Sequence, residues 1–251
     1  MIRLAGTLYL SAAIAFVAVF SYLAQQLGYP ELLDRPAAEV LPALLAAGGA
    51  ARAAWAVYAL LPLLLLPAAT LSAPAMRGAY RGDDGVVALL TGLQWVAGLS
   101  MMAGLLRWST VQWELASRWV TADATGRATL ATHFDLLNVY LGNGLGEFVG
   151  ELALYSSFVL MGVAMRRTGW SRIVAWCAWV TGAAGLVGAF RNITSVVQPV
   201  ADVVNGLLPL FLVMLGVALW RRRGPLDSPL RGSLGATGGC GSLGATRRAD
   251  R

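Results

Sequence analysis

The sequence contains no lysine and a single histidine, and these absences exclude several kinds of chemistry. All nineteen basic residues are arginine, so the chain lacks the lysine of a Walker A loop and the amine that forms a retinal or pyridoxal Schiff base. One histidine, His133, cannot form the histidine pair of an HExxH metalloprotease or of a bis-histidine haem. The two cysteines, Cys177 and Cys240, are too few for a metal cluster. We therefore expect no metal and no cofactor.

Charged residues are also scarce. They make up 13% of the chain, against 57% in the hydrophobic set, and the mean hydropathy is +0.64. Because a soluble domain carries about 25% charged residues, this composition predicts a protein whose solvent is the lipid bilayer. The fold class that we expect is all-α, a polytopic bundle of transmembrane helices.

Six apolar segments approach the roughly twenty residues that a helix needs to cross the hydrocarbon core. They are residues 4–24, 53–71, 86–106, 134–165, 173–190 and 200–220. The first is longer than the apolar part of a signal peptide, so we expect a retained helix. Residues 1–223 would then form one six-helix transmembrane domain. Residues 224–251, which are rich in glycine and repeat the hexamer Gly-Ser-Leu-Gly-Ala-Thr, are expected to be a disordered cytoplasmic tail.

The arginines favour one orientation, because positive charge stays on the cytoplasmic side of short loops. With the N-terminus inside, thirteen arginines are cytoplasmic, at positions 3, 77, 81, 166, 167, 172, 221, 222, 223, 231, 247, 248 and 251. Six are external, at positions 35, 52, 107, 118, 127 and 191. This predicts a multi-pass protein of the inner (plasma) membrane with both termini in the cytoplasm. Since the arginines are scattered among apolar runs, we expect no nucleic-acid partner.

Two external loops are too long for simple turns. Residues 36–48 have the pattern of a short amphipathic helix lying on the outer membrane surface. The other loop contains Trp108, Trp113 and Trp119. Because tryptophan favours the headgroup level, this stretch is interpreted as an interfacial anchor or an extension of the third helix. A ligand-binding cap is the alternative.

One stripe of the fourth span carries polar side chains at the 100° spacing of an α-helix. These are Tyr140, Asn143, Glu147 and Glu151, with His133 close to the same face. A carboxylate at mid-membrane costs at least about 2.5 kcal/mol, so two of them one turn apart indicate a functional site. If the helix enters the bilayer near residue 134, the first glutamate lies near the midplane and the second in the inner half.

Other polar residues are expected to complete this site. Gln94 on the third span and Tyr9 on the first are the nearest candidate hydrogen-bond partners for the two glutamates. Arg191, Asp202 and Asn205 lie at the outer ends of the last two spans and are expected to form the mouth of the cavity. We expect Arg191 and Asp202 to pair there.

Glycines recur every four residues on the fourth span, one face over from the acidic stripe, at positions 142, 146 and 150. The fifth span also carries small residues, with glycines at 182, 185 and 188. Because small residues let helix backbones approach closely, the fourth and fifth helices are predicted to pack against each other.

Several short motifs resemble a known family. They are the opening Arg3–Tyr9, the entry to the second span at Ala51–Tyr58, the glycine-rich fourth span, and the turn Arg166–Arg172 before a tryptophan-rich fifth span. Together they resemble the bacterial integral-membrane family catalogued as domain of unknown function 4386. The resemblance implies a six-helix inner-membrane protein of undefined activity and transfers no catalytic residue.

The favoured hypothesis is a membrane protein that binds or transports a small polar or lipidic ligand at the acidic stripe. Its expected partners are membrane lipids and a small-molecule ligand or a partner membrane subunit. A scaffold or regulatory subunit without its own chemistry is the alternative. An enzyme that uses Glu147 or Glu151 as a general base is less favoured, because no nucleophile or phosphate-binding motif accompanies these acids.

Overall fold

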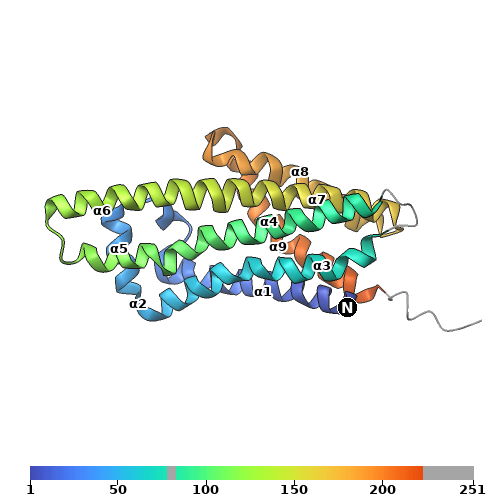
Figure 1. Ribbon diagram of the computed structural model, residues 1–251, viewed down its shortest axis with the longest axis horizontal. Helices are drawn as coiled ribbons and strands as arrows, with labels where there is room; N and C mark the ends of the chain where they lie inside the picture. The colour runs from blue at the N-terminus through green and yellow to red at the C-terminus, as the bar shows by residue number, and fades with distance from the viewer. Residues whose placement is uncertain (78–82, 223–251) are drawn as a thin grey trace, which may run out of the picture.

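The computed structural model describes residues 1–77 and 83–222. The predicted tail, residues 224–251, lies outside the described residues. The described chain forms an elongated bundle of helices, with the N-terminus and the end of α9 at one end and α5 and α6 at the other (Figure 1).

Six helical spans in the described residues are long and apolar enough to cross a membrane. The first is α1 (Ile2–Leu27), which a 3-10 turn, η1 (Glu31–Asp34), follows. The other elements, in chain order, are α2 (Ala37–Leu60), η2 (Leu61–Leu64), α3 (Leu65–Met76), α4 (Asp83–Ser109), α5 (Val111–Trp119), α6 (Ala124–Leu137), η3 (Asn138–Val149), α7 (Gly150–Arg167), α8 (Arg172–Gly188), η4 (Ala189–Asn192), η5 (Ser195–Val197) and α9 (Gln198–Arg221). The all-α, six-span prediction is confirmed: the protein is a multi-pass helical membrane protein.

The spans differ greatly in length. The continuous helix from Ala124 to Arg167 has 44 residues, or roughly 60 Å, whereas the span Arg172–Asn192 has 21 residues, or roughly 30 Å, the thickness of a hydrocarbon core. Accordingly, α8 and α9 cover only the half of the bundle nearer the N-terminus (Figure 1). We call the part that continues past them, made of η1, α5, α6 and the start of α2, the distal extension.

The expected helix at residues 36–48 exists, but its apolar side packs inside the protein. It forms the start of α2, and Gly48, with φ of 74°, separates it from the rest of that helix by a kink. Val40, Leu41 and Leu44 are fully buried against the bundle. The apolar face that the sequence pattern assigned to lipid is therefore used for packing within the protein.

The tryptophan-rich loop extends the third span, which is one of the possibilities that the sequence leaves open. Thr110 interrupts the helix between α4 and α5. Trp108 is fully buried and stacks on Trp55 with ring centroids 5.2 Å apart, so it is not an interfacial anchor. Trp113 and Trp119 are half-buried.

Buried apolar side chains gather in two clusters. The proximal core, in the half that contains α8 and α9, includes Tyr9, Phe158 and Phe211. The distal core joins the distal extension to α1, α2 and α4 and includes Trp55 and Trp108.

Glycines bring neighbouring helices into backbone contact. A Cβ atom added at Gly104 of α4 would lie 2.6 Å from the Cα atom of Gly146, so only glycine fits at this crossing of α4 and η3. Around α8, Gly182 and Gly185 pack against Tyr155 of α7. The predicted packing of the fourth and fifth spans is thus confirmed, but Gly142, Gly146 and Gly150 of the fourth span face the third span instead.

Candidate functional site

The segment that carries the predicted acidic stripe is wound as a π-helix rather than an α-helix. Its backbone hydrogen bonds reach the fifth residue along, which widens each turn, and its glycines Gly142, Gly144 and Gly146 supply conformational freedom. The 100° spacing therefore does not apply here. Tyr140, expected on the acidic face, is 74% exposed.

Glu147 and Glu151 meet at a single arginine of the next span. Arg191, in η4, donates from Nη1 to Glu151 Oε2 at 2.6 Å and from Nη2 to Glu151 Oε1 at 2.8 Å. Its Nη2 also donates to Glu147 Oε2 at 2.9 Å. A two-point bond between guanidinium and carboxylate is the strongest form of ion pair in proteins. We call these three residues the carboxylate–arginine cluster.

A neighbouring amide completes the cluster. Asn192 donates from Nδ2 to Glu147 Oε2 at 2.7 Å and to the backbone carbonyl of Asn143 at 3.4 Å. Asn143 thus takes part through its backbone. The side chains of Arg191, Glu147 and Glu151 are 17%, 31% and 14% exposed, so Glu147 is the most open of the three.

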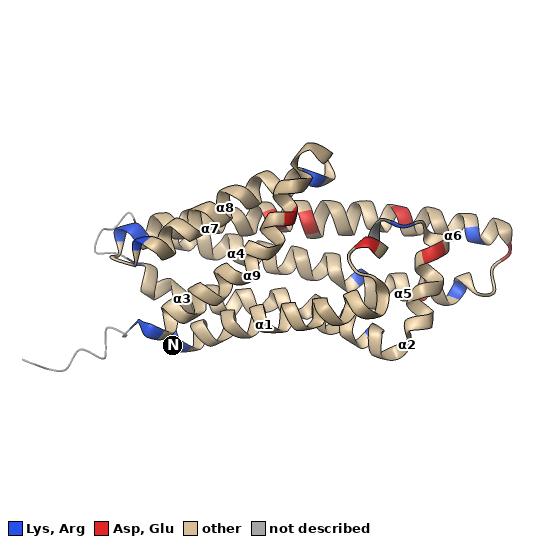
Figure 2. Ribbon diagram, turned by 180° about the vertical axis from the view of Figure 1, so that it is seen from behind, with Lys and Arg blue, Asp and Glu red and all other residues tan. Residues whose placement is uncertain are grey.

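The cluster lies near one end of the short spans, not at their middle. Glu151 is about 22 Å and Glu147 about 28 Å along the helix from Arg166, and Arg191 belongs to the last turn of its span. The helix begins at Ala124, earlier than the expected entry near residue 134, and runs through the distal extension before it reaches the level of α8. The depth of the two glutamates in the bilayer stays a prediction. Red segments lie midway along the molecule in Figure 2, where η3 continues into α7.

Two predicted hydrogen-bond partners are engaged elsewhere. Gln94 is fully buried in the proximal half and accepts a hydrogen bond from the Tyr9 hydroxyl at 2.7 Å, so it does not contact the glutamates. Asp202 accepts from Gln198 Nε2 at 2.9 Å and does not pair with Arg191. The predicted pair is wrong because Arg191 binds Glu147 and Glu151, which precede it in the sequence by forty positions or more.

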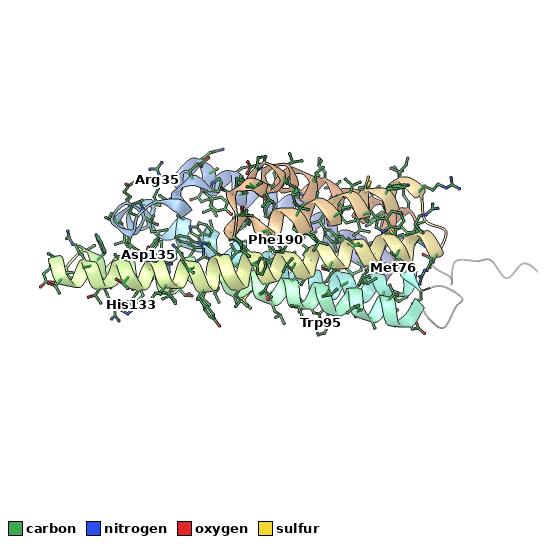
Figure 3. All side chains as sticks on the ribbon, turned by 90° about the horizontal axis from the view of Figure 1, so that it is seen from above. Arg35, Met76, Trp95, His133, Asp135 and Phe190 are labelled. Atoms are coloured by element: carbon green, nitrogen blue, oxygen red, sulfur yellow. The ribbon has the colours of Figure 1, made fainter. Side chains whose placement is uncertain are left out.

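His133 is also separate from the cluster. It lines a surface groove of the distal extension, together with Arg118 and Thr129. Figure 3 shows His133 on the part of the long helix that runs past Phe190, which adjoins Arg191. His133 therefore does not line the pocket that Glu147 and Glu151 line.

A cavity of about 200 Å³ adjoins the cluster, between the proximal and distal cores. Much of its wall is apolar and comes from α1, η2, α3, α4 and α9, including Phe16, Leu61, Leu65, Leu105, Leu208 and Leu212. Its polar wall contains Glu147, Glu151, Arg191 and Asn205. Of the residues expected at the mouth, Arg191 and Asn205 line this cavity.

Arg107 is a cavity residue that the sequence interpretation missed. It is 5% exposed. Its Nε donates to Asn138 Oδ1 at 3.0 Å and its Nη1 to the carbonyl of Gly104. A Cβ atom at Gly142 would lie 2.6 Å from the Arg107 Cζ atom, so the guanidinium rests where only a glycine leaves room. The sequence does carry a signal for it, since Arg107 directly follows the apolar run 86–106. The sequence interpretation uses this arginine only for the topology.

Tyr29, between α1 and α2, contributes to the distal side of the cavity. Its ring packs edge-on against Trp55 and Tyr58, with centroids 5.3 Å and 5.9 Å away. Burial raises the pKa of the Tyr29 hydroxyl above its usual 10.0. At neutral pH the hydroxyl therefore remains protonated and able to donate a hydrogen bond.

Comparisons with known proteins identify no relative. No family model, no curated protein and no solved structure matches the chain. The resemblance to the family catalogued as domain of unknown function 4386 stays a prediction.

Proposed function

We propose that the protein resides in the bacterial inner membrane and binds a small amphipathic ligand in the cavity beside the carboxylate–arginine cluster. The observation that carries this proposal is the division of the cavity into apolar and charged walls. Pockets that bind small molecules are mostly apolar, with a few polar groups that fix the ligand's orientation. An amphipathic molecule matches both walls at once.

The position of the cavity supports the same ligand class. Arg191 marks the end of the short fifth span, where the hydrocarbon core would give way to headgroups. The apolar wall includes Leu208 and Leu212 of α9, which continue into the span. A ligand could therefore keep its polar group at the headgroup level and its chain among the helices.

The arginine distribution supports an external location for the cavity. Basic segments gather at the end of the bundle that carries the N-terminus (Figure 2). Arginines of the connections at that end include Arg3, Arg77, Arg166, Arg172 and Arg222. Because cytoplasmic loops carry the excess of positive charge, this end faces the cytoplasm in our proposal and the cavity opens toward the outer side.

Binding is better supported than transport. Between the cavity and the basic end, the proximal core is filled by side chains such as Phe158 and Phe211, whose ring centroids are 4.7 Å apart. Passage of a ligand would require this core to open. The glutamates, in this proposal, hold Arg191 in the cavity wall and do not themselves bind a cationic ligand.

A cavity-filling substitution tests the proposed function. Leu208 lines the cavity, whereas Leu210 of the same helix is 67% exposed and faces away. We expect Leu208→Trp to weaken binding of eight-carbon amphiphiles, octanoate and 1-octanol, by at least about tenfold in isothermal titration calorimetry, a loss of about 1.4 kcal/mol. The matched control Leu210→Trp should bind as the wild type does. Equal binding by both variants, or no binding by the wild type, would overturn the proposal.

A further inference from the structure

The charge that the cavity offers to a ligand is that of Arg107. Arg191, the other arginine in the wall, is already bound by Glu147 and Glu151. Arg107 forms no ion pair with any carboxylate among the side chains that the structure describes, which leave out those of residues 34 and 83. Its Nε and Nη1 have neutral acceptors, and its Nη2 makes no hydrogen bond within the described part of the chain.

A buried guanidinium without a direct ion pair is unfavourable, because it loses hydration, and the carboxylate of Glu147 acts on Arg107 only through space. An anion beside Nη2 would remove this penalty and would gain a charge-assisted hydrogen bond. Tyr29 of the same wall accepts a hydrogen bond from the Tyr58 hydroxyl, so its own hydroxyl proton can be donated to the same anion.

We propose that the ligand carries an oxyanion head group, a carboxylate or a phosphate, and that the guanidinium of Arg107 binds it. This inference rests on the proposed binding function and specifies the ligand's chemical class. The apolar part of the ligand lies along Phe16, Leu208 and Leu212. A cavity of about 200 Å³ suits a single short chain and not a two-chain phospholipid.

Arg107 is held in place for this role. Asn138 Oδ1 accepts from Arg107 Nε at 3.0 Å and also from Gln112 Nε2 at 3.0 Å, which ties the guanidinium to two helices. The Arg107 Cζ atom lies 4.9 Å from the centre of the Trp108 ring. A side chain fixed before binding loses little conformational entropy when the ligand arrives.

A cationic head group is disfavoured by the same geometry. Glu147 lines the cavity, but its Oε2 already accepts from Arg191 and Asn192. An ammonium group at this point would meet Arg191 as well as the carboxylate. The carboxylate–arginine cluster is therefore a weaker site for a cation than Arg107 is for an anion.

The test is a charge series on one chain length. Octanoate, octyl phosphate, 1-octanol and octylammonium are titrated into the purified full-length protein at neutral pH and fixed salt. We expect at least one of the two anions to bind about tenfold more tightly than 1-octanol, or about 1.4 kcal/mol, and octylammonium to bind no better than 1-octanol. Octanoate against octyl phosphate identifies the preferred head group.

Two variants at Arg107 and its acceptor Asn138, with one control variant, test whether the preference for anions depends on Arg107. Arg107→Gln removes the charge, and the isosteric Asn138→Asp keeps the acceptor of Arg107 while giving it an internal carboxylate. Both should abolish the preference for anions. The control is Arg52→Gln, because Arg52 also lies over a tryptophan ring, that of Trp113, and donates to the Ser109 carbonyl without lining the cavity.

The outcomes separate this inference from the proposed function. Equal binding of anion and alcohol by the wild type, tighter binding of octylammonium, or an anion preference that survives in the variants would overturn the role of Arg107 and leave amphiphile binding intact. Failure of the wild type to bind any of the four compounds would overturn the proposed function itself. Size-exclusion elution checks folding, and if Arg107→Gln does not fold, Asn138→Asp decides.

Discussion

The proximal core and the cavity region bury polar side chains in different ways. In the proximal half, the Tyr9 hydroxyl and Gln94 share one neutral hydrogen bond of 2.7 Å, and both residues are fully buried and do not line the cavity described above. At the junction with the distal core, Glu147, Glu151 and Arg191 are charged and border open space. Neutral groups in closed packing can orient helices, whereas charges kept beside a cavity indicate a binding site.

The largest effect is expected from breaking the charged cluster. Arg191→Leu leaves the carboxylates of Glu147 and Glu151 partly buried without their cation, which should cost about 3–5 kcal/mol of unfolding free energy. Chemical denaturation of the detergent-solubilised protein measures this loss. Replacing all three residues with leucine should restore most of the stability. If Arg191→Leu alone were as stable as the wild type, the cluster would contribute nothing to the free energy of unfolding.

A smaller effect sharpens the comparison within the cluster. Glu151 accepts two hydrogen bonds from Arg191 and is 14% exposed, whereas Glu147 accepts one from Arg191 and is 31% exposed. Glu151→Gln should therefore cost about 1.5–3 kcal/mol, and Glu147→Gln about 1 kcal/mol, in the same denaturation experiment. The reverse order would contradict the arrangement of these bonds.

The smallest effect is expected in the proximal half. Gln94→Leu removes a single neutral hydrogen bond, and such bonds in membrane proteins average about 0.6 kcal/mol. Octanoate affinity, measured by calorimetry, should stay within about twofold of the wild type because Gln94 does not line the cavity. A tenfold loss of affinity would show that the two regions are coupled and that the comparison fails.

The spans themselves could be predicted from composition, because the bilayer imposes a minimum length on every apolar helix. The expectation that Glu147 and Glu151 have polar partners also followed from sequence, since a carboxylate in an apolar run requires one. What the sequence pattern could not supply was the partner. Arg191 is forty residues from Glu151, and only the packing of η4 against η3 brings them together.

Two other features depend on the backbone and not on residue type. The π-helical segment 138–149 changes which side chains share a face, so the predicted stripe does not hold there, and Tyr140 is exposed. Gly142 had been interpreted as a helix-packing residue, yet the space above it holds the Arg107 guanidinium. A periodicity argument assumes a regular helix, and it fails where glycines allow another winding.

The measurement that tests the central claim most directly is a crystal structure of the protein grown with octanoate. The account predicts a carboxylate within hydrogen-bond distance of Arg107 Nη2 and a chain that runs between α1 and α9 toward Leu212. A cavity filled by side chains, or octanoate bound only on the lipid-facing surface, would contradict it.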